Sequence, residues 1–184
     1  GHEIGDMIAG RLIHSMATTV KAMSKVPTPA ILEEIIARLK DAKEELKFGA
    51  EVLKTLPIPD FERETEYISL YREGEYAFLK GNIFSSDTGE VSYRDYREMT
   101  NEYLCDHSTA KRTKHNRESF MVGALARFNN SHKWLSDDAK QTAEDLGLKA
   151  PCYNPFMNNV AQFVELVHIA DDSIKAAEEL LNMD

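Results

Sequence analysis

Two residues in the C-terminal part of the chain have the spacing of a metal-binding helix. Glu165 and His168 lie three residues apart in Glu-Leu-Val-His, the spacing that carboxylate-bridged di-iron sites in helical bundles use. Such a site needs a second Glu-x-x-His and two further glutamates, and the sequence contains no second copy. We therefore interpret the pair as part of a polar helix strip whose histidine is satisfied by hydrogen bonds.

The cysteines offer a second candidate for metal chemistry. Cys105 stands two residues before His107, and Cys152 is the other cysteine of the chain. A thiolate–imidazole metal site usually contains a Cys-x-x-Cys pair, and this sequence has none. Nothing marks the chain as secreted, so two separate reduced thiols are the better interpretation.

The basic stretch after His107 could support nucleophilic or anion-binding chemistry. His107 and Ser108 stand near Lys111, and basic residues continue to Arg117. No orienting acid, oxyanion loop or phosphate-binding glycine loop accompanies them. The stretch is typical of a solvated loop, and we expect a polar loop over residues 106–118.

Arg127 follows an apolar run, where a guanidinium needs a partner. Two interpretations stay open on the residues alone. Arg127 either forms an internal ion pair or presents its charge to a functional site.

The elements that would position these residues are mostly helical. Apolar spacings of three and four predict long helices, and Thr28-Pro29, Ser136 and Asn154-Pro155 have the residue types of helix N-caps. The predicted fold class is mainly α with a small β element (α+β), and residues 1–184 are predicted to form a single domain. The predicted long helices are 3–24, 28–53, 136–146 and 154–182, and the first two are expected to form an αα-hairpin. Residues 60–70 are weakly helical, and a short helix is expected to end near Cys105. Strands are predicted at 76–84 and 90–93 on either side of a turn, and a buried strand is predicted within residues 119–130.

Charge and hydropathy exclude two classes of partner. The net charge is −9, with 22 basic and 31 acidic residues, so we expect no nucleic-acid binding. No apolar run approaches the roughly 20 residues of a membrane span, so we expect no membrane insertion.

Several stretches, in the right order, resemble the large subunits of nickel–iron hydrogenases. The motif at residues 122–130, combined with the helix after Asn154, is the most specific of these. The resemblance covers essentially the whole chain. The Asn-Asn ending is similar to that of the cytoplasmic archaeal and bacterial enzymes, which implies a cytoplasmic location. The resembling stretches are Gly10-Arg11-Leu12-Ile13-His14, His107-Ser108-Thr109-Ala110-Lys111, Val122-Gly123-Ala124-Leu125-Ala126-Arg127-Phe128-Asn129-Asn130, and Asn154-Pro155-Phe156 with Ala161-Gln162-Phe163-Val164-Glu165.

The resemblance implies a helix-bundle core of the hydrogenase large-subunit type and a parent that oxidises or evolves hydrogen with an iron–sulfur small subunit as partner. Family members hold nickel and iron with two Cys-x-x-Cys motifs, one near each end of the subunit. Neither occurs here, so we expect no cofactor, metal ligand or catalytic residue in this segment, and an inactive scaffold around a centre held by the parent. Lys111 and Arg127 are, by resemblance, the residues that would support that centre.

The pattern departs from the family once more, at Lys21-Ala22, where the family usually has Gly-Gly. The chain also begins and ends inside helical patterns, so we expect it to be a central part of a longer subunit. Such a segment should expose apolar surface and self-associate. Two other hypotheses remain: a metal-free relative such as the quinone-site subunit of respiratory complex I, and a helical protein-interaction module.

Overall fold

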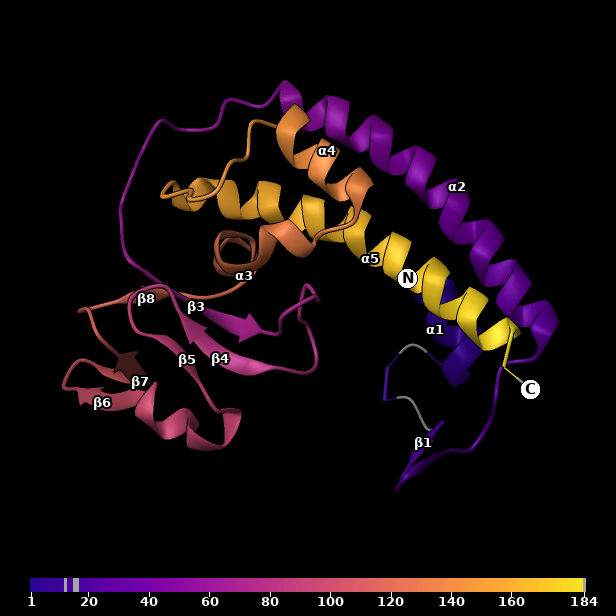
Figure 1. Cartoon of the computed structure of the whole chain (residues 1–184), viewed down its shortest axis with the longest axis horizontal. Coiled ribbons are helices and arrows are strands. Elements are labelled where there is room, and N and C mark those ends of the chain that lie inside the picture. The colour runs from indigo at the N-terminus through magenta and orange to yellow at the C-terminus, as the bar shows by residue number, and fades with distance from the viewer. Residues whose placement is uncertain (12, 15–16, 184) are drawn as a thin grey trace. The chain divides into compact units, whose positions relative to one another are not determined.

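The computed structural model describes residues 1–11, 13–14 and 17–183 (Figure 1). Contacts divide the chain into two compact units, one made of Gly1–Phe48 with Ile169–Asp184 and the other of Gly49–His168. Helices and short strands are mixed, which confirms the predicted α+β class. None of the described helices is both long and apolar enough to cross a membrane.

The first unit begins with a helix much shorter than predicted. Helix α1 spans His2–Ala9 and ends where Gly10 adopts φ 74°, a left-handed conformation that suits glycine. Beyond it, β1 (Thr18–Thr19) and β2 (Ala22–Met23) form a small antiparallel hairpin. The predicted helix 3–24, its αα-hairpin and the Gly-Arg-x-x-His helix were therefore wrong; Leu12 and Met16 of its apolar stripe lie outside the described residues.

The β1–β2 turn contains a residue in a conformation that suits glycine. Lys21 adopts φ 65°, in the left-handed region where a side chain is strained. A glycine at position 21, which the family that the sequence resembles usually has, would relieve that strain.

Helix α2 (Pro29–Lys54) begins as the sequence predicts. The Thr28 hydroxyl accepts a hydrogen bond from the Ile31 N–H at 3.4 Å, and Pro29 occupies the first helical position. In the first unit, Leu32 and Ile36 of α2 pack against Ala177, Ile174 and Leu181 of α5 (Asn158–Leu181). This packing buries part of the apolar stripe predicted for each helix.

A four-stranded sheet is the base of the second unit, in the order β5-β4-β3-β8. Strands β3 (Glu66–Tyr71), β4 (Asn82–Ser85) and β5 (Gly89–Val91) are antiparallel, whereas β8 (Phe120–Met121) runs parallel to β3. The β4–β5 hairpin confirms the turn predicted at residues 85–89 with shorter strands. The weak helix predicted over residues 60–70 was wrong, because β3 occupies its second half.

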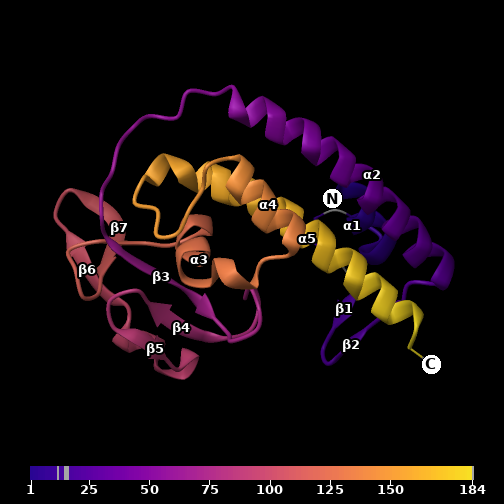
Figure 2. The ribbon, with the colours of Figure 1, turned by 45° about the horizontal axis from the view of Figure 1, so that its top comes forward.

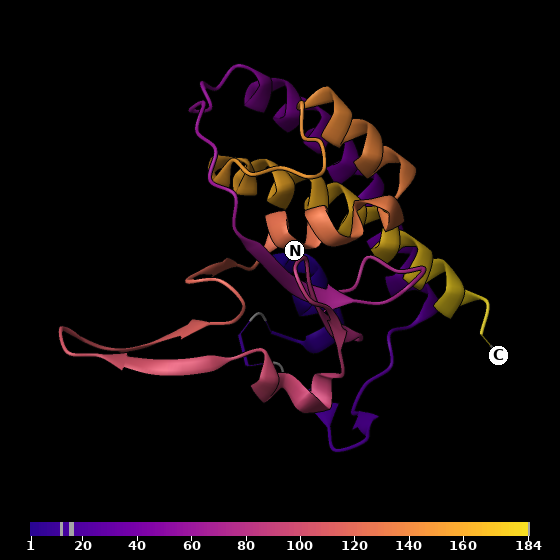
Figure 3. The ribbon, with the colours of Figure 1, turned by 60° about the vertical axis from the view of Figure 1, so that its left-hand side comes forward.

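A second hairpin replaces the predicted basic loop. After the 3₁₀ helix η1 (Tyr93–Glu98), β6 (Asn101–Cys105) pairs with β7 (Ser108–Lys114). Figure 3 shows this hairpin extending away from the sheet. The predicted short helix ending near Cys105 is thus a 3₁₀ turn followed by a strand, and the loop predicted over residues 106–118 is largely a strand with solvent on its polar side chains.

The apolar run before Arg127 is mostly a helix. Only Phe120–Met121 is a strand; the chain then turns at Gly123, with φ 89°, into α3 (Ala124–Ser131). In Figures 1 and 2, α3 lies between the sheet and the first half of α5. The predicted buried strand was wrong because the glycine permits a sharp turn and Ala124-Leu125-Ala126 then continues as a buried helical turn.

The remaining elements of this unit have the predicted caps. The Ser136 hydroxyl accepts from the Ala139 N–H at the start of α4 (Asp137–Asp145), and Gly147 follows that helix with φ 72°. The Asn154 side chain accepts from the Phe156 N–H at 2.9 Å at the start of the last helical segment. The bounds are η2 (His132–Trp134), α4 (Asp137–Asp145), η3 (Pro155–Met157) and α5 as given above.

Candidate functional site

Arg127 and Glu165, which belong to separate stretches of the family resemblance, meet between α3 and α5. Arg127 Nε donates to Glu165 Oε1 at 2.7 Å, and Nη2 donates to Oε2 at 2.9 Å. The Tyr76 hydroxyl donates to the same Oε1 at 2.9 Å. Glu165 is buried, so this bidentate pair is the internal ion pair that the sequence left open as one interpretation of Arg127.

Aromatic rings enclose the Arg127–Glu165 pair. The Arg127 guanidinium carbon lies 5.3 Å from the centre of the Phe78 ring, within cation–π distance. His168 stacks on Phe78 at 6.2 Å and meets Tyr76 edge-on at 5.2 Å. The rings limit the access of water to the ion pair, which strengthens the attraction between its charges.

The surroundings shift the pKa values of Arg127 and Tyr76. Hydrogen bonds from the guanidinium to Glu165 raise the pKa of Arg127. Burial, followed by the nearby Glu165 charge, raises the pKa of Tyr76 far above its ordinary value. Tyr76 therefore stays a neutral hydrogen-bond donor and does not act as a base.

His168 is engaged as the sequence interpretation expects. Its Nδ1 accepts a hydrogen bond from the Ser136 N–H at 3.1 Å, so the ring is neutral with its proton on Nε2. Together with the Arg127 contacts of Glu165, this uses both members of the Glu-x-x-His spacing in packing between elements. The interpretation of that spacing as a polar strip with a satisfied histidine is confirmed.

The asparagines around Arg127 bind α3 to three other segments. The Asn129 side chain donates to the Cys152 carbonyl and accepts from the Cys152 N–H, both at 2.9 Å. Asn130 donates to the Ser69 hydroxyl of β3 at 2.9 Å. The Asn158 side chain of α5 accepts from the Leu125 N–H at 3.1 Å, which caps the start of α3.

Lys111, the other residue singled out by resemblance, has different surroundings. It lies on β7, is exposed, and its ammonium group is 3.1 Å from Glu102 on β6. In the described part of the chain, no hydrogen bond or ion pair joins Lys111 to Arg127. The structure therefore does not bring the two candidate residues into one site.

The cysteines do not form a metal site. Cys105 and Cys152 are free thiols, and burial raises the pKa of Cys152, which keeps its thiol protonated. Within residues 1–11, 13–14 and 17–183, no group of three or more His, Cys, Asp or Glu side chains could hold a metal ion. Two separated cysteines do not fit a centre that needs four thiolates.

A second buried carboxylate, Glu66 on β3, was not identified from the sequence. It is fully buried, and its Oε1 contacts the Ser85 hydroxyl and His115 Nδ1, each at 2.5 Å. Its Oε2 accepts from the Asn116 N–H at 3.1 Å. These contacts fasten the base of the β6–β7 hairpin to the sheet. A charged residue directly before the apolar Tyr67-Ile68 was the available signal, but its partners are about 20 to 50 residues away.

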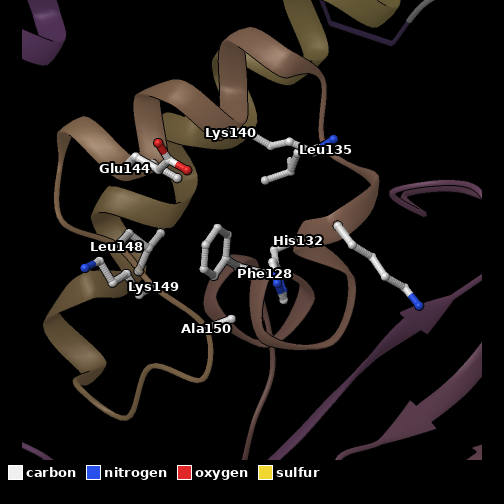
Figure 4. Close-up of a pocket in the computed structure, with 10 residues that line it drawn as sticks. Phe128, His132, Leu135, Lys140, Glu144, Leu148, Lys149 and Ala150 are labelled. Carbon is white, nitrogen blue, oxygen red and sulfur yellow. The ribbon is translucent and has the colours of Figure 1, made fainter.

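A hollow of about 470 Å³ opens among α3, η2, α4 and the segment after α4. In Figure 4, Phe128 points into it, while the ammonium group of Lys149 points away. Phe128, Leu135 and Leu148 form a buried apolar floor, with charged side chains at the rim. The lining offers apolar contact but no arrangement of nucleophile and base.

Comparison with known proteins supports the family resemblance without establishing it. No family model matches the chain. The chain is 28% identical over 178 residues to the protein named sulfhydrogenase 1 subunit alpha of Pyrococcus furiosus. The matched region is 96% of this chain but 42% of that subunit, so the chain spans less than half the length of the relative. The sequence is thus similar to part of a hydrogenase alpha subunit.

Proposed function

We propose that this chain is a scaffold segment of a nickel–iron hydrogenase large subunit whose metal ligands lie in other parts of the parent. The observation that carries the proposal is the similarity to a hydrogenase alpha subunit over 96% of the chain. The relative is much longer, which leaves room for ligand-bearing motifs outside the matched region. The parent would oxidise or evolve hydrogen in the cytoplasm, with an iron–sulfur small subunit as partner.

The packing around α3 supports a scaffold role. Arg127, Asn129 and Asn130 connect α3 to α5, to the Cys152 segment and to β3. A helix held from three sides is a rigid support, and rigid supports keep metal ligands in place. In this proposal Arg127 acts through the Glu165 pair, and Lys111 presents a positive charge from the β6–β7 hairpin.

The deciding test uses the complete parent reading frame. It should contain a Cys-x-x-Cys on each side of the present segment, and the parent produced with its small subunit should bind nickel and reduce a viologen dye with hydrogen. A native reading frame without these motifs would instead support the metal-free relative. The 184-residue chain alone should show no hydrogen uptake and no nickel; stoichiometric nickel after purification would overturn the proposal.

Arg127 and Lys111 can be tested in the same parent protein. Arg127→Lys keeps the charge but loses the bidentate geometry, and we expect lower hydrogen oxidation at full nickel occupancy. Arg94→Lys is a matched control, because Arg94 is an exposed residue of η1. Equal activities for Arg127→Lys and the wild type would remove Arg127 from the proposal and leave the scaffold role intact.

Self-association is proposed from the exposed apolar residues. Phe48 and Val52 lie four residues apart on α2 and are 73% and 45% exposed, and Leu56 just beyond the helix is 52% exposed. Burying such a stripe against another surface is favourable. Light scattering should show concentration-dependent association of the isolated chain that Phe48→Glu reduces; a monomer at all concentrations would contradict this part.

A further inference from the structure

A small pocket beside the edge strand β8 has the lining of a ligand site. It encloses about 300 Å³ within the second unit, at the lower end of the range for pockets that bind small molecules. A volume of this size suits a ligand with a single ring. The lining residues are Phe61, Arg63, Thr65, Tyr67, Ser119, Phe120, Met121, Tyr153 and Pro155.

Aromatic rings dominate the walls of this pocket. Tyr67 and Tyr153 lie with their ring centres 6.2 Å apart, and Phe61 and Phe120 add two further rings. Aromatic side chains favour planar aromatic partners through edge-to-face and offset contacts, each worth about 0.5–1.5 kcal/mol beyond the area they bury. The walls therefore favour a flat aromatic ring over a saturated one.

The Tyr67 hydroxyl has no hydrogen-bond partner among the described residues. The Tyr67 side chain is only 2% exposed, and its backbone N–H is bonded to Ser86. Burial raises the pKa of Tyr67 to about 12, so the hydroxyl keeps its proton at neutral pH. The hydroxyl is not among the buried polar atoms that lack a partner, so water reaches it from the pocket. A polar group on a ligand can take the place of that water.

A guanidinium without a carboxylate partner stands at the same pocket. Arg63 donates to the Ser119 hydroxyl at 3.3 Å, and its backbone N–H donates to the Tyr153 carbonyl. No ion pair joins it to another residue that the structure describes, whereas the neighbouring Glu64 pairs with Arg117 at 3.1 Å. Arg63 can therefore take a carboxylate of a ligand in bidentate geometry.

We propose that this pocket binds a small aromatic carboxylate with a polar group on the far side of its ring. The ring lies among the aromatic walls, the carboxylate meets the Arg63 guanidinium, and the distal polar group meets the Tyr67 hydroxyl. The binding test uses this chain alone and does not depend on the proposed function. 4-Hydroxybenzoate has all three features and serves as the probe.

Isothermal titration of the 184-residue chain with 4-hydroxybenzoate tests the proposal. Each substitution should remove one recognition feature. Arg63→Gln should weaken binding about tenfold, as loss of one charge-assisted hydrogen bond predicts. Tyr67→Phe removes only the hydroxyl; it should weaken 4-hydroxybenzoate several-fold and leave the affinity for benzoate unchanged.

Matched controls and related ligands separate this site from weak adsorption. Tyr103→Phe and Arg94→Gln make the same chemical changes outside the pocket and should leave the affinity unchanged. Cyclohexanecarboxylate keeps the charge but lacks the planar ring and should bind more weakly than benzoate. The proposal is overturned by absence of saturable binding at about 10 mM ligand, by equal binding of the saturated acid, or by unchanged affinity in both pocket variants.

Discussion

Two ion pairs lie in segments that resemble the same family, and they differ in almost every physical respect. Arg127–Glu165 connects two helices, is bidentate and accepts a third hydrogen bond from buried Tyr76. Lys111–Glu102 connects two strands of one hairpin at a single distance of 3.1 Å, with both side chains more than half exposed. The first pair connects distant parts of the chain, and the second lies across a local hairpin.

The difference shows where a charged motif residue affects folding. Removing one partner from a buried pair leaves an uncompensated charge, which destabilises a protein by about 3–5 kcal/mol. An exposed pair contributes about 0–1 kcal/mol, because water and salt screen it. Loss of the Arg127–Glu165 pair should therefore lower the free energy of unfolding much more than loss of the Lys111–Glu102 pair.

The largest effect is expected from Glu165→Ala. It leaves the partly buried Arg127 guanidinium without its anion and the Tyr76 hydroxyl without its acceptor, so the free energy of unfolding should fall by about 3 kcal/mol. Urea denaturation followed by circular dichroism measures the loss. Glu102→Ala is the matched control in the exposed pair and should change stability by less than about 0.5 kcal/mol. Equal losses for the two variants would remove the distinction between the pairs.

A second substitution tests whether the hairpin is fastened at its base. Glu66→Gln keeps the shape but places an amide where the Ser85, His115 and Asn116 groups converge, and stability should fall by about 1–3 kcal/mol. Amide hydrogen exchange should accelerate across residues 101–114 more than in α3. Unchanged exchange in the hairpin would show that Glu66 does not hold it to the sheet.

A smaller effect is expected at the start of α3. Asn158→Ala removes the acceptor for the Leu125 N–H, the same loss as at a helix N-cap, and should cost about 1 kcal/mol. Asn182→Ala, near the exposed end of α5, is the control. Chemical denaturation compares the free energies of unfolding of the two variants. If Asn158→Ala loses no more stability than Asn182→Ala, water replaces the cap.

Features determined by neighbouring residues could be predicted from the sequence. Thr28-Pro29, Ser136 and Asn154 cap helices at the predicted positions, since a cap needs only a side chain and the N–H groups two or three residues later. The β4–β5 turn could be predicted for the same reason, because neighbouring residues determine it. Gly147 likewise ends a helix through its own backbone conformation.

Features that depend on distant partners could not be predicted. The apolar spacing continues past Gly10, so the end of α1 is visible only in the glycine conformation. Strand β7 has no alternation of apolar residues, because its two-stranded sheet has exposed side chains along most of the strand. The site was predicted in part: Arg127 needed a partner, but only the packing of α3 on α5 shows that this partner is Glu165.

The Arg117–Asp87 pair is intermediate in burial between the two pairs compared above, and its effect on stability should depend on pH. Hydrogen bonds from Arg117, with weaker help from Asn116, lower the pKa of Asp87. A carboxyl whose pKa is lower in the folded state stabilises the fold above its unfolded pKa of about 3.9, and this stability is lost as the pH falls through the folded value. Asp87→Asn should therefore lower the melting temperature at pH 5 and flatten its decline toward about pH 2. Parallel melting curves for variant and wild type would contradict this assignment.

Lys111→Ala should have the smallest effect on the free energy of unfolding, so a change in the parent's activity would report on function and not on stability. Its ammonium group is exposed and meets one exposed carboxylate, so the free energy of unfolding should change by less than about 0.5 kcal/mol. Lys114→Ala is the matched control on the same strand, with Glu118 as its neighbour at 3.6 Å. In the complete parent, hydrogen oxidation should fall in Lys111→Ala and not in Lys114→Ala, with nickel content unchanged in both. If both variants keep full activity, the proposed role of Lys111 is contradicted and Lys111 is only a surface residue of the hairpin.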